Sequence, residues 1–397
     1  MSATRAVPVT IAPRTATPVG LPAAPGAPMA TSGTRVAAAS GLAGSTAHRV
    51  PGAGVVPEPH GALRDRHGRT VRDLRLSLTD RCNLRCTYCM PAQGLDWLPS
   101  DALLTAAETI RLARLGVERL GVERIRLTGG EPLMRRDLEE IVAGLATLRT
   151  HAGTKPDLAM TTNGLGLDKR AARLRAAGLD RLNVSIDTVD RAAYGATTRR
   201  DRLGDVLAGA ETAQAAGLWP VKVNAVALPG TLETQAPALL ETCLRRGWEL
   251  RFIEHMPLGP VSTWQAEDVV GAEQVLAGLR AAGFGLTEVG RPDRRPAALW
   301  DVAPSGDRPG GRVGVIASVT APFCSDCDRT RITADGRLMT CLFSTTETDL
   351  RSLLRSGADD DAVALAWAHA TWVKPAAHGS DEPGFARPSR TMSAIGG

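Results

Sequence analysis

The sequence predicts an α/β fold in which parallel strands and helices alternate around a partial barrel. Between residues 72 and 290, short strand patterns alternate with longer helical patterns about six times, as in βαβ units with a parallel sheet. Several strands carry polar residues on one face, although a sheet covered on both faces would be apolar on both. We therefore expect a partial (β/α)6 barrel of the TIM type, with a polar ligand on its concave side and a C-terminal extension.

The first repeats show the pattern most clearly. Residues 74–78 alternate between leucine and polar residues, which predicts a strand. Thr105 and Glu108 have the spacing of a capping box, which begins a helix. Residues 125–127 then predict a second strand, and later strands are expected at 182–187, 221–226 and 250–255.

The chain divides into three predicted parts. Residues 1–60 are rich in Ala, Pro, Gly and Thr without periodicity, and we expect a disordered tail because such a segment buries too little apolar surface to order itself. Its arginines and lack of acids also fit a transit peptide, which stays an alternative. Residues 61–300 form the predicted core domain, and residues 301–397 form a C-terminal domain with a second cysteine group.

The charge distribution excludes several classes of partner. The net charge is +5, and four arginines before residue 58 supply most of it, so the rest of the chain lacks the basic stripe of a nucleic-acid-binding protein. No apolar run reaches the roughly 20 residues that span a bilayer. There is no secretory signal pattern either, and we expect a cytoplasmic protein.

The first cysteine group follows the first predicted strand. Cys82, Cys86 and Cys89 have the spacing C-x3-C-x2-C, and three soft thiolates on one short loop suit an iron–sulfur cluster. Three protein ligands for a cubane would leave one iron open for a cofactor or substrate. The alternative is a structural zinc site, which would normally need a fourth ligand nearby; the next histidine is His151.

Two further motifs carry chemistry. Gly129 and Gly130 precede Glu131-Pro132 after the second strand, where the absence of Cβ atoms allows close approach of a ligand. Near the C-terminus, Arg329-Thr330-Arg331 lies within a second cysteine group with the spacing C-x2-C-x13-C. Arginines so placed can bind phosphates bidentately, or they can be solvated surface residues. The second group comprises Cys324, Cys327 and Cys341.

Together these motifs resemble the MoaA family of GTP 3′,8-cyclases, which belongs to the radical S-adenosylmethionine (SAM) superfamily. The resemblance runs from about residue 72 to the C-terminus. It is carried by both cysteine groups and by residues 126–133, 161–164, 183–187, 221–224 and the terminal Gly396-Gly397.

The resemblance implies two [4Fe–4S] clusters, one on each cysteine group, and SAM bound to the open iron of the first. It implies that SAM contacts Tyr88, Gly130, Ser185 and Met256. From the residues alone, Ser185 could equally be a solvated strand residue and Met256 a core methionine. It further implies that GTP contacts Arg75, Arg126, Thr161, Lys222, Arg329, Thr330 and Arg331, with Arg329 and Arg331 also assigned to catalysis.

The implied reaction is a radical cyclisation, in the carbon–carbon lyase class, at the first step of molybdenum cofactor biosynthesis. A radical derived from SAM abstracts the ribose 3′ hydrogen of GTP, and the carbon radical attacks C8 of guanine to give (8S)-3′,8-cyclo-7,8-dihydro-GTP. The implied partners are a one-electron reductant of the flavodoxin or ferredoxin type and a downstream cyclic pyranopterin monophosphate synthase. A homodimer is compatible with the sequence.

Two other functions fit parts of the sequence. A peptide-modifying radical SAM enzyme would also carry an auxiliary cluster, but usually with more cysteines and without the two arginines or the Gly-Gly end. A non-catalytic iron–sulfur or zinc protein would not need the glycine turn. A paralogue that has lost activity would show the same motifs. Cys243 lies outside both groups, and we expect it to be a buried thiol.

Overall fold

The computed structural model describes residues 58, 60–230, 232–258, 264–292, 295–380 and 385–396. The chain divides into two units, residues 1–49 and 50–397, and the helices and strands of the described residues belong to the second. The predicted tail of residues 1–60 lies outside the described residues, apart from Glu58 and His60.

All strands of the second unit join one twelve-stranded sheet in the order β12-β11-β10-β1-β2-β3-β4-β5-β6-β9-β8-β7. The strands are β1 (Asp73–Ser77), β2 (Arg124–Thr128), β3 (Asp157–Thr162), β4 (Arg181–Ser185), β5 (Val221–Ala227), β6 (Glu249–Glu254), β7 (Leu286–Gly290), β8 (Ala298–Val302), β9 (Gly311–Ile316), β10 (Arg329–Ile332), β11 (Arg337–Met339) and β12 (Thr348–Asp349).

The centre of the sheet consists of six parallel strands, β1 to β6, in sequence order. This confirms the predicted (β/α)6 arrangement. Strand β10 adds to β1 in parallel and β9 adds to β6 in parallel, while β7, β8, β11 and β12 extend the two edges in antiparallel pairs. The sheet therefore ends at β12 and β7, as an open partial barrel requires.

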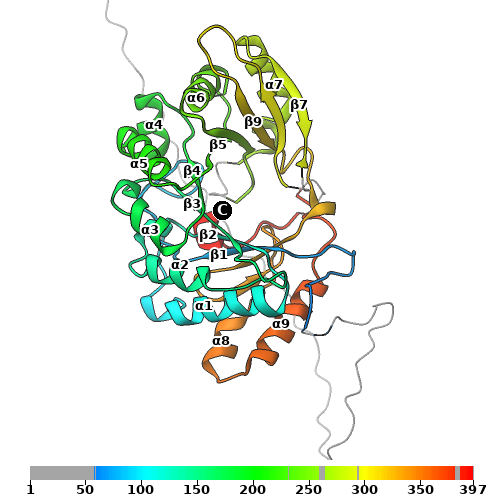
Figure 1. The fold of residues 1–397 in the computed structure, drawn as a ribbon. Helices are drawn as coiled ribbons and strands as arrows, with labels where there is room; N and C mark the ends of the chain where they lie inside the picture. The colour runs from blue at the N-terminus through cyan, green and yellow to red at the C-terminus, as the bar shows by residue number, and fades with distance from the viewer. Residues whose placement is uncertain are drawn as a thin grey trace, which may run out of the picture. The chain divides into compact units, whose positions relative to one another are not determined.

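Helices cover the outer face of the strands, and Figure 1 shows α1, α2, α3 and α5 outside β1 to β4. The helices are α1 (Ala106–Arg114), α2 (Leu138–Ala146), α3 (Ala171–Ala177), α4 (Arg191–Thr198), α5 (Leu203–Ala215), α6 (Leu232–Arg246), α7 (Ala272–Ala281), α8 (Leu350–Arg355), α9 (Asp360–Trp372) and α10 (Met392–Ile395). Within the described residues, none is long and apolar enough to cross a membrane.

The local signals in the sequence act as expected. Thr105 Oγ1 accepts a hydrogen bond from the Glu108 backbone at 3.1 Å, and Glu108 accepts one from the Thr105 backbone at 2.8 Å, which completes the capping box. Leu74 and Leu76 are fully buried between sheet and helices. Cys243 is also fully buried, and its environment is apolar, so the expectation of a buried thiol is confirmed.

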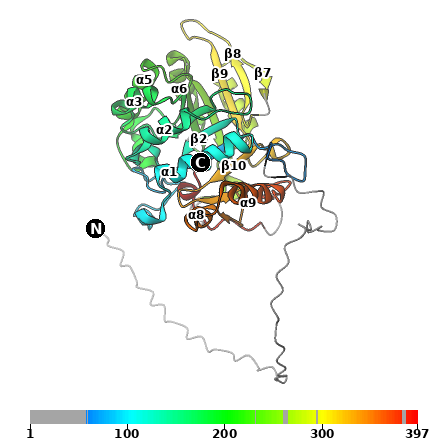
Figure 2. The ribbon, with the colours of Figure 1, turned by 60° about the horizontal axis from the view of Figure 1, so that its bottom comes forward.

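The C-terminal part of the chain packs against the first repeat. The backbone N–H groups of Arg72 and Asp73 both donate to the carbonyl of Asp328, at 2.8 and 3.1 Å, where β10 joins β1. Figure 2 shows α8 and α9 beside β10 and near α1. This segment shares a sheet with the core, and residues 50–397 form one unit. The domain boundary at residue 300 stays a prediction.

Candidate active site

A row of basic side chains crosses the sheet at one level. In the strand register, Arg75 on β1 pairs with Arg331 on β10 and with Arg126 on β2, and one strand further Ala159 pairs with Arg181 on β4. Residues at one register level point to the same face of a sheet. The sequence pattern that set Arg75 and Arg126 opposite the buried leucines therefore places them on the concave face.

These side chains line a cavity that we call the basic cavity. Five cations expected to contact substrate line it, together with Thr161 and Met256, and so do all three cysteines of the second group. The five cations are Arg75, Arg126, Lys222, Arg329 and Arg331. Thr330 is not among the lining residues and is fully buried, because alternation along β10 turns it to the opposite face from its two neighbours.

The positive charges of the basic cavity are incompletely neutralised. The Nε atoms of Arg75 and Arg126 are buried and have no hydrogen-bond partner among the described residues. Burial lowers the pKa of Arg126 well below its ordinary value, and the charge of Arg75 lowers it further. Burial also lowers the pKa of Arg75 to about 9 and that of Lys222 to about 8. An anion in this cavity would relieve the repulsion and restore these pKa values.

Sequence reasoning missed four arginines of this cavity: Arg124, Arg181, Arg251 and Arg295. Arg251 is 8% exposed and donates to Glu249 at 2.6 Å, and Glu249 also lies 3.5 Å from Lys222 Nζ. Alternation within the expected strand could have identified Arg251. It lies between Leu250 and Phe252, which are both buried.

The first cysteine group lines a second cavity, the cysteine cavity. Its lining includes Cys82, Cys86 and Cys89 and all four residues expected to contact SAM, which are Tyr88, Gly130, Ser185 and Met256. The Tyr88 hydroxyl donates to Asp187 at 2.9 Å. Burial raises the pKa of the Cys89 thiol to about 12 and that of Cys86 well above its ordinary value. A cation such as iron is needed for these thiols to ionise near neutral pH.

The two cavities adjoin each other. Thr161, Asn224, Ile253, Met256 and Met392 line both of them. A ligand in the cysteine cavity can therefore reach one in the basic cavity. Ser185 lines the cysteine cavity, and Met256 lines both cavities and also packs against the hydrophobic cluster around Leu258, so a contact of either residue with SAM stays a prediction.

The loop of the first cysteine group is held by the end of α4. Thr87 donates its backbone N–H to the carbonyl of Thr197 at 2.9 Å, and the Arg199 guanidinium donates to the carbonyl of Arg85 at 2.8 Å. Arg199 has φ = 56°, a conformation that is uncommon for any residue other than glycine. The strain is tolerated where the helix ends against the cysteine loop.

The glycine turn packs directly on the start of that loop. A Cβ atom on Gly129 would lie 2.5 Å from the carbonyl oxygen of Thr79, and one on Gly130 would lie 2.3 Å from that of Arg81. The backbone N–H of Gly130 donates to Thr79 at 2.7 Å. The glycines are therefore required by contact between two backbones, in addition to any approach of a ligand.

Glu131 ties the turn to the end of β3. Its carboxylate is 1% exposed and accepts hydrogen bonds from Thr162 Oγ1 at 2.7 Å, the Asn163 backbone at 2.7 Å and the Leu133 backbone at 2.9 Å. Burial raises its pKa to about 7 despite these donors. Sequence reasoning treated this residue only as part of the turn.

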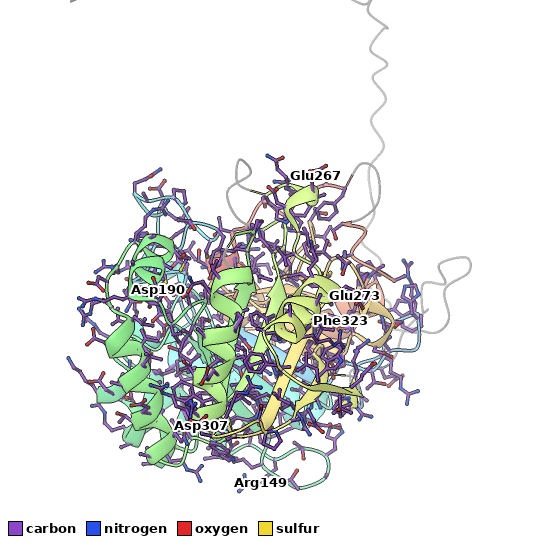
Figure 3. The ribbon with its side chains drawn as sticks, turned by 90° about the horizontal axis from the view of Figure 1, so that it is seen from above. Arg149, Asp190, Glu267, Glu273, Asp307 and Phe323 are labelled. Carbon is purple, nitrogen blue, oxygen red and sulfur yellow. The ribbon has the colours of Figure 1, made fainter. Side chains whose placement is uncertain are left out.

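The second cysteine group has a more positive environment. Burial raises the pKa of Cys327, but the charges of Arg329 and Lys374 outweigh this effect and lower it to about 7. Phe323, labelled in Figure 3, precedes the group and has the Arg329 guanidinium 4.7 Å from its ring centroid. Arg331 is buried and Arg329 is half-buried, and both line the basic cavity beside the cysteines, so neither is a fully solvated surface arginine.

The spacing of the thiols differs from that of a mononuclear site. In the described part of the chain, no three Cys, His, Asp or Glu side chains converge closely enough to hold a single metal ion. The cysteines of each group nevertheless line one cavity. An iron–sulfur cluster is compatible with this spacing, because each thiolate binds a different iron.

The C-terminal segment enters the same region. The Arg331 guanidinium donates to the carbonyl of Gly396 at 2.6 Å, and Ile395 is fully buried. A Cβ atom on Gly396 would lie 2.4 Å from Ser77 Oγ and 2.2 Å from Thr128 Oγ1. Figure 1 shows the red C-terminal helix α10 beside β1 and β2. Gly397 lies outside the described residues.

We predict that Gly130→Ala destabilises the protein by at least about 2 kcal/mol, because the new methyl group must displace backbone at the cysteine loop. It should also reduce the iron held by the first cysteine group. The matched control is Gly195→Ala in α4, where a Cβ meets nothing within 4 Å. Thermal unfolding and iron analysis of both variants test this, and a Gly130→Ala protein with unchanged values would contradict it.

Comparison with known proteins agrees with this geometry. Residues 76–243 match the radical SAM superfamily, and residues 248–380 match the family Molybdenum Cofactor Synthesis C. By structure, Streptococcus suis SuiB bound to S-adenosylmethionine aligns with a TM-score of 0.50 at 13% identity, covering 74% of this chain and 67% of SuiB, which shows a shared fold.

Sequence relatives are much more similar. The GTP 3′,8-cyclase of Corynebacterium glutamicum strain ATCC 13032 is 56% identical over 337 residues, covering 84% of this chain and 89% of the relative. That of Mycobacterium marinum is 56% identical over 342 residues, covering 85% and 92%. The chain therefore belongs to the GTP 3′,8-cyclase family of radical SAM enzymes, which use a [4Fe–4S] cluster and SAM in the first step of molybdenum cofactor biosynthesis.

Proposed function

We propose that this chain converts GTP to (8S)-3′,8-cyclo-7,8-dihydro-GTP, with SAM in the cysteine cavity and GTP in the basic cavity. The observation that carries the proposal is that half-buried Arg75 and Arg126 each have a buried Nε atom without a hydrogen bond to any described residue, in a cavity that adjoins the one lined by the first three cysteines. A triphosphate supplies the negative charge that these cations lack. The shared lining of the two cavities would bring the ribose of GTP close to SAM.

The donors around the cysteine cavity fit a [4Fe–4S] cluster and SAM. Cys82, Cys86 and Cys89 would hold the cluster, since three thiolates leave one iron open. Tyr88, Gly130, Ser185 and Met256 would contact SAM, because all four line the same cavity. When bound, the cluster and SAM supply the carbon radical that removes the ribose 3′ hydrogen.

A second [4Fe–4S] cluster would be held by Cys324, Cys327 and Cys341. These cysteines line the basic cavity, so an open iron there would face the nucleotide. The lowered pKa of Cys327 favours the thiolate that iron requires. GTP would then lie between the two cysteine groups.

The remaining residues would position the substrate. Arg75, Arg126, Thr161 and Lys222 come from β1, β2, β3 and β5, four of five consecutive parallel strands, and would hold GTP by charge and hydrogen bonds. Arg329 and Arg331 would hold the nucleotide next to the second cluster. Thr330 would act through its backbone position between them, since its side chain faces away from the cavity. Arg331 also holds the C-terminal segment, whose Met392 would help to exclude water from both cavities.

Several predictions made from the sequence belong to this proposal without a structural argument. The electrons would come from a one-electron reductant of the flavodoxin or ferredoxin type, and the product would pass to a cyclic pyranopterin monophosphate synthase. A homodimer, a cytoplasmic location, and the divisions of the chain at residues 60 and 300 stay predictions.

An anaerobic assay tests the proposed function. The protein is reconstituted with iron and sulfide, given dithionite, SAM and GTP, and its products are followed by mass spectrometry. GTP-dependent formation of 5′-deoxyadenosine and of the cyclised nucleotide supports the proposal. 5′-Deoxyadenosine without a product from GTP would instead favour a peptide-modifying enzyme. Neither product, from protein that holds both clusters, would favour a non-catalytic role.

We predict that Arg329→Ala and Arg331→Ala each lower GTP turnover by at least about tenfold, the effect of one lost charge-assisted hydrogen bond. Cleavage of SAM should persist, because neither arginine lines the cysteine cavity. The control is Arg312→Ala, which removes an exposed partner of Asp301. Equal loss of 5′-deoxyadenosine and cyclised product, at normal iron content, would show that the two functions are not separable in this way.

We predict that deleting Gly396-Gly397 abolishes cyclisation and leaves the folded state intact. The deletion removes the carbonyl that accepts from Arg331 but keeps Ile395 in its apolar contacts. Circular dichroism and thermal unfolding report the fold, and the assay above reports activity. Full activity of the truncated protein would refute a role for the tail.

We predict that GTP affinity falls as pH rises from 7.5 through the lowered pKa of Lys222, which is about 8 in the free protein. Bound phosphate favours the protonated amine, so affinity is fully supported below this pKa and is lost above it. Lys222→Met should weaken binding about tenfold at pH 7.5 and flatten the profile. Binding titrations between pH 7.5 and 8.8 measure this. If GTP affinity falls with pH as steeply in the variant as in the wild type, Lys222 is excluded as the source of the pH dependence.

A further inference from the structure

A buried lysine outside all the motifs contacts the second cysteine group. Lys374 follows α9 and is only 2% exposed, whereas lysines are rarely buried unless they are paired. Its ammonium donates to Cys327 Sγ at 3.3 Å, to the Cys327 carbonyl at 3.0 Å and to the Arg329 carbonyl at 2.7 Å. An ammonium has three N–H donors, so all of them are used, and one is directed at a sulfur.

The chain fixes this lysine through the segment that follows it. Arg69 donates to the carbonyls of Pro375 and Ala376, at 2.5 and 2.8 Å, and to that of Cys324 at 2.6 Å. Arg69 is itself held by Asp65, at 2.6 Å, and both residues are buried. The Arg69 guanidinium therefore joins the segment after Lys374 to the second cysteine group, and this contact holds the ammonium of Lys374 next to Cys327.

The charge of Lys374 is not cancelled locally. Its three acceptors are two carbonyls and a thiol, and over the described ranges no salt bridge joins it to a carboxylate. A charge in a buried position acts strongly on its neighbours, because little water screens it. The ammonium therefore acts mainly on the sulfur of Cys327 and on whatever that sulfur binds.

In the described part of the chain, no lysine or arginine donates a hydrogen bond to a sulfur of the first cysteine group, although the Arg85 guanidinium donates to the carbonyl of Cys82 at 2.7 Å. The amide of Asn163, which is neutral, is the side chain that reaches Cys82 Sγ, at 3.8 Å. The carboxylates of Glu131 and Asp187 line the same cavity. The two cysteine groups thus differ in how a cation meets them: Lys374 donates to a sulfur of the second group, whereas Arg85 donates to a carbonyl of the first, whose cavity also contains two carboxyl groups.

We propose that Lys374 is a positioning residue that raises the reduction potential of the second cluster and makes it the more readily reduced of the two. The inference rests on the proposed function, in which Cys324, Cys327 and Cys341 hold that cluster. A cluster gains one negative charge when it takes up one electron, and a buried cation hydrogen-bonded to a ligand sulfur stabilises that added charge.

The test is an anaerobic redox titration of the full-length reconstituted protein, followed by electron paramagnetic resonance. The signal that changes on addition of SAM is assigned to the first cluster and the other to the second. In Lys374→Met, the ratio of reduced to oxidised second cluster at a fixed potential should fall at least about tenfold, a shift of about 59 mV for one electron. The reduction potential of the first cluster should not change.

The matched control is Lys155→Met. Lys155 is half-buried and pairs with Asp180 and with the carbonyl of Gly178, away from both cysteine groups. It should leave both couples unchanged. Lys374→Gln is the second variant, since its amide can still donate to the two carbonyls while the charge is gone, and it should shift the second couple in the same direction.

Iron analysis separates failure of this inference from failure of the proposed function. Wild-type protein that binds iron for a single cluster would refute the second cluster itself. If both clusters load and the second couple stays in place in Lys374→Met, the role of Lys374 is overturned. If Lys374→Met does not load the second group, Lys374→Gln decides: a negative shift supports the inference and an unmoved couple overturns it.

Discussion

The parallel pairing of β10 with β1 is the constraint on which the rest of the site depends. It joins residues more than 250 positions apart, with Arg75 opposite Arg331 and Asp73 opposite Arg329. Through it Cys324 and Cys327, which precede β10, lie at the start of β1, whereas the first cysteine group follows the end of that strand. A slip of one residue would turn Arg329 and Arg331 outward and Thr330 into the cavity. The hydrogen bonds from Arg72 and Asp73 to the carbonyl of Asp328 fix that register.

The pairing of β10 with β1 concentrates positive charge on the concave face of the sheet. The buried Nε atoms of Arg75 and Arg126 carry a cost in the free energy of folding, because burial removes water and no hydrogen bond to a described residue replaces it. The pKa values of Arg75, Arg126 and Lys222 all fall for this reason. A site that is costly when empty and satisfied by a polyanion is organised for its ligand in advance. Ion pairs such as Arg124 with Asp328 and Arg181 with Asp157 limit the cost around its rim.

The cysteine cavity is organised by backbone contacts. The Gly129-Gly130 turn touches the backbone of residues 79–81, and Glu131 links that turn to Thr162 and Asn163. Asn163 in turn reaches Cys82 and Asn83. Three loops from three neighbouring strands are therefore held as one unit. This explains why short motifs far apart in the chain occur together: each supplies a contact that another one needs. Lys374 and Arg69 play a corresponding part at the second cysteine group.

The sequence by itself determined the features that depend on local periodicity and local chemistry. Alternation placed Arg75, Arg126 and Lys222 opposite the buried positions of their strands, the capping box set the start of α1, and the spacing of the thiols indicated clusters before any fold was known. Only the tertiary structure decided which distant residues meet. In the structure Arg251 lines the basic cavity, Thr330 does not line it, and Lys374 donates a hydrogen bond to Cys327. The reason is physical: backbone geometry and hydrophobic period act over a few residues, whereas register between strands and the burial of a charge are set by the packing of the whole chain.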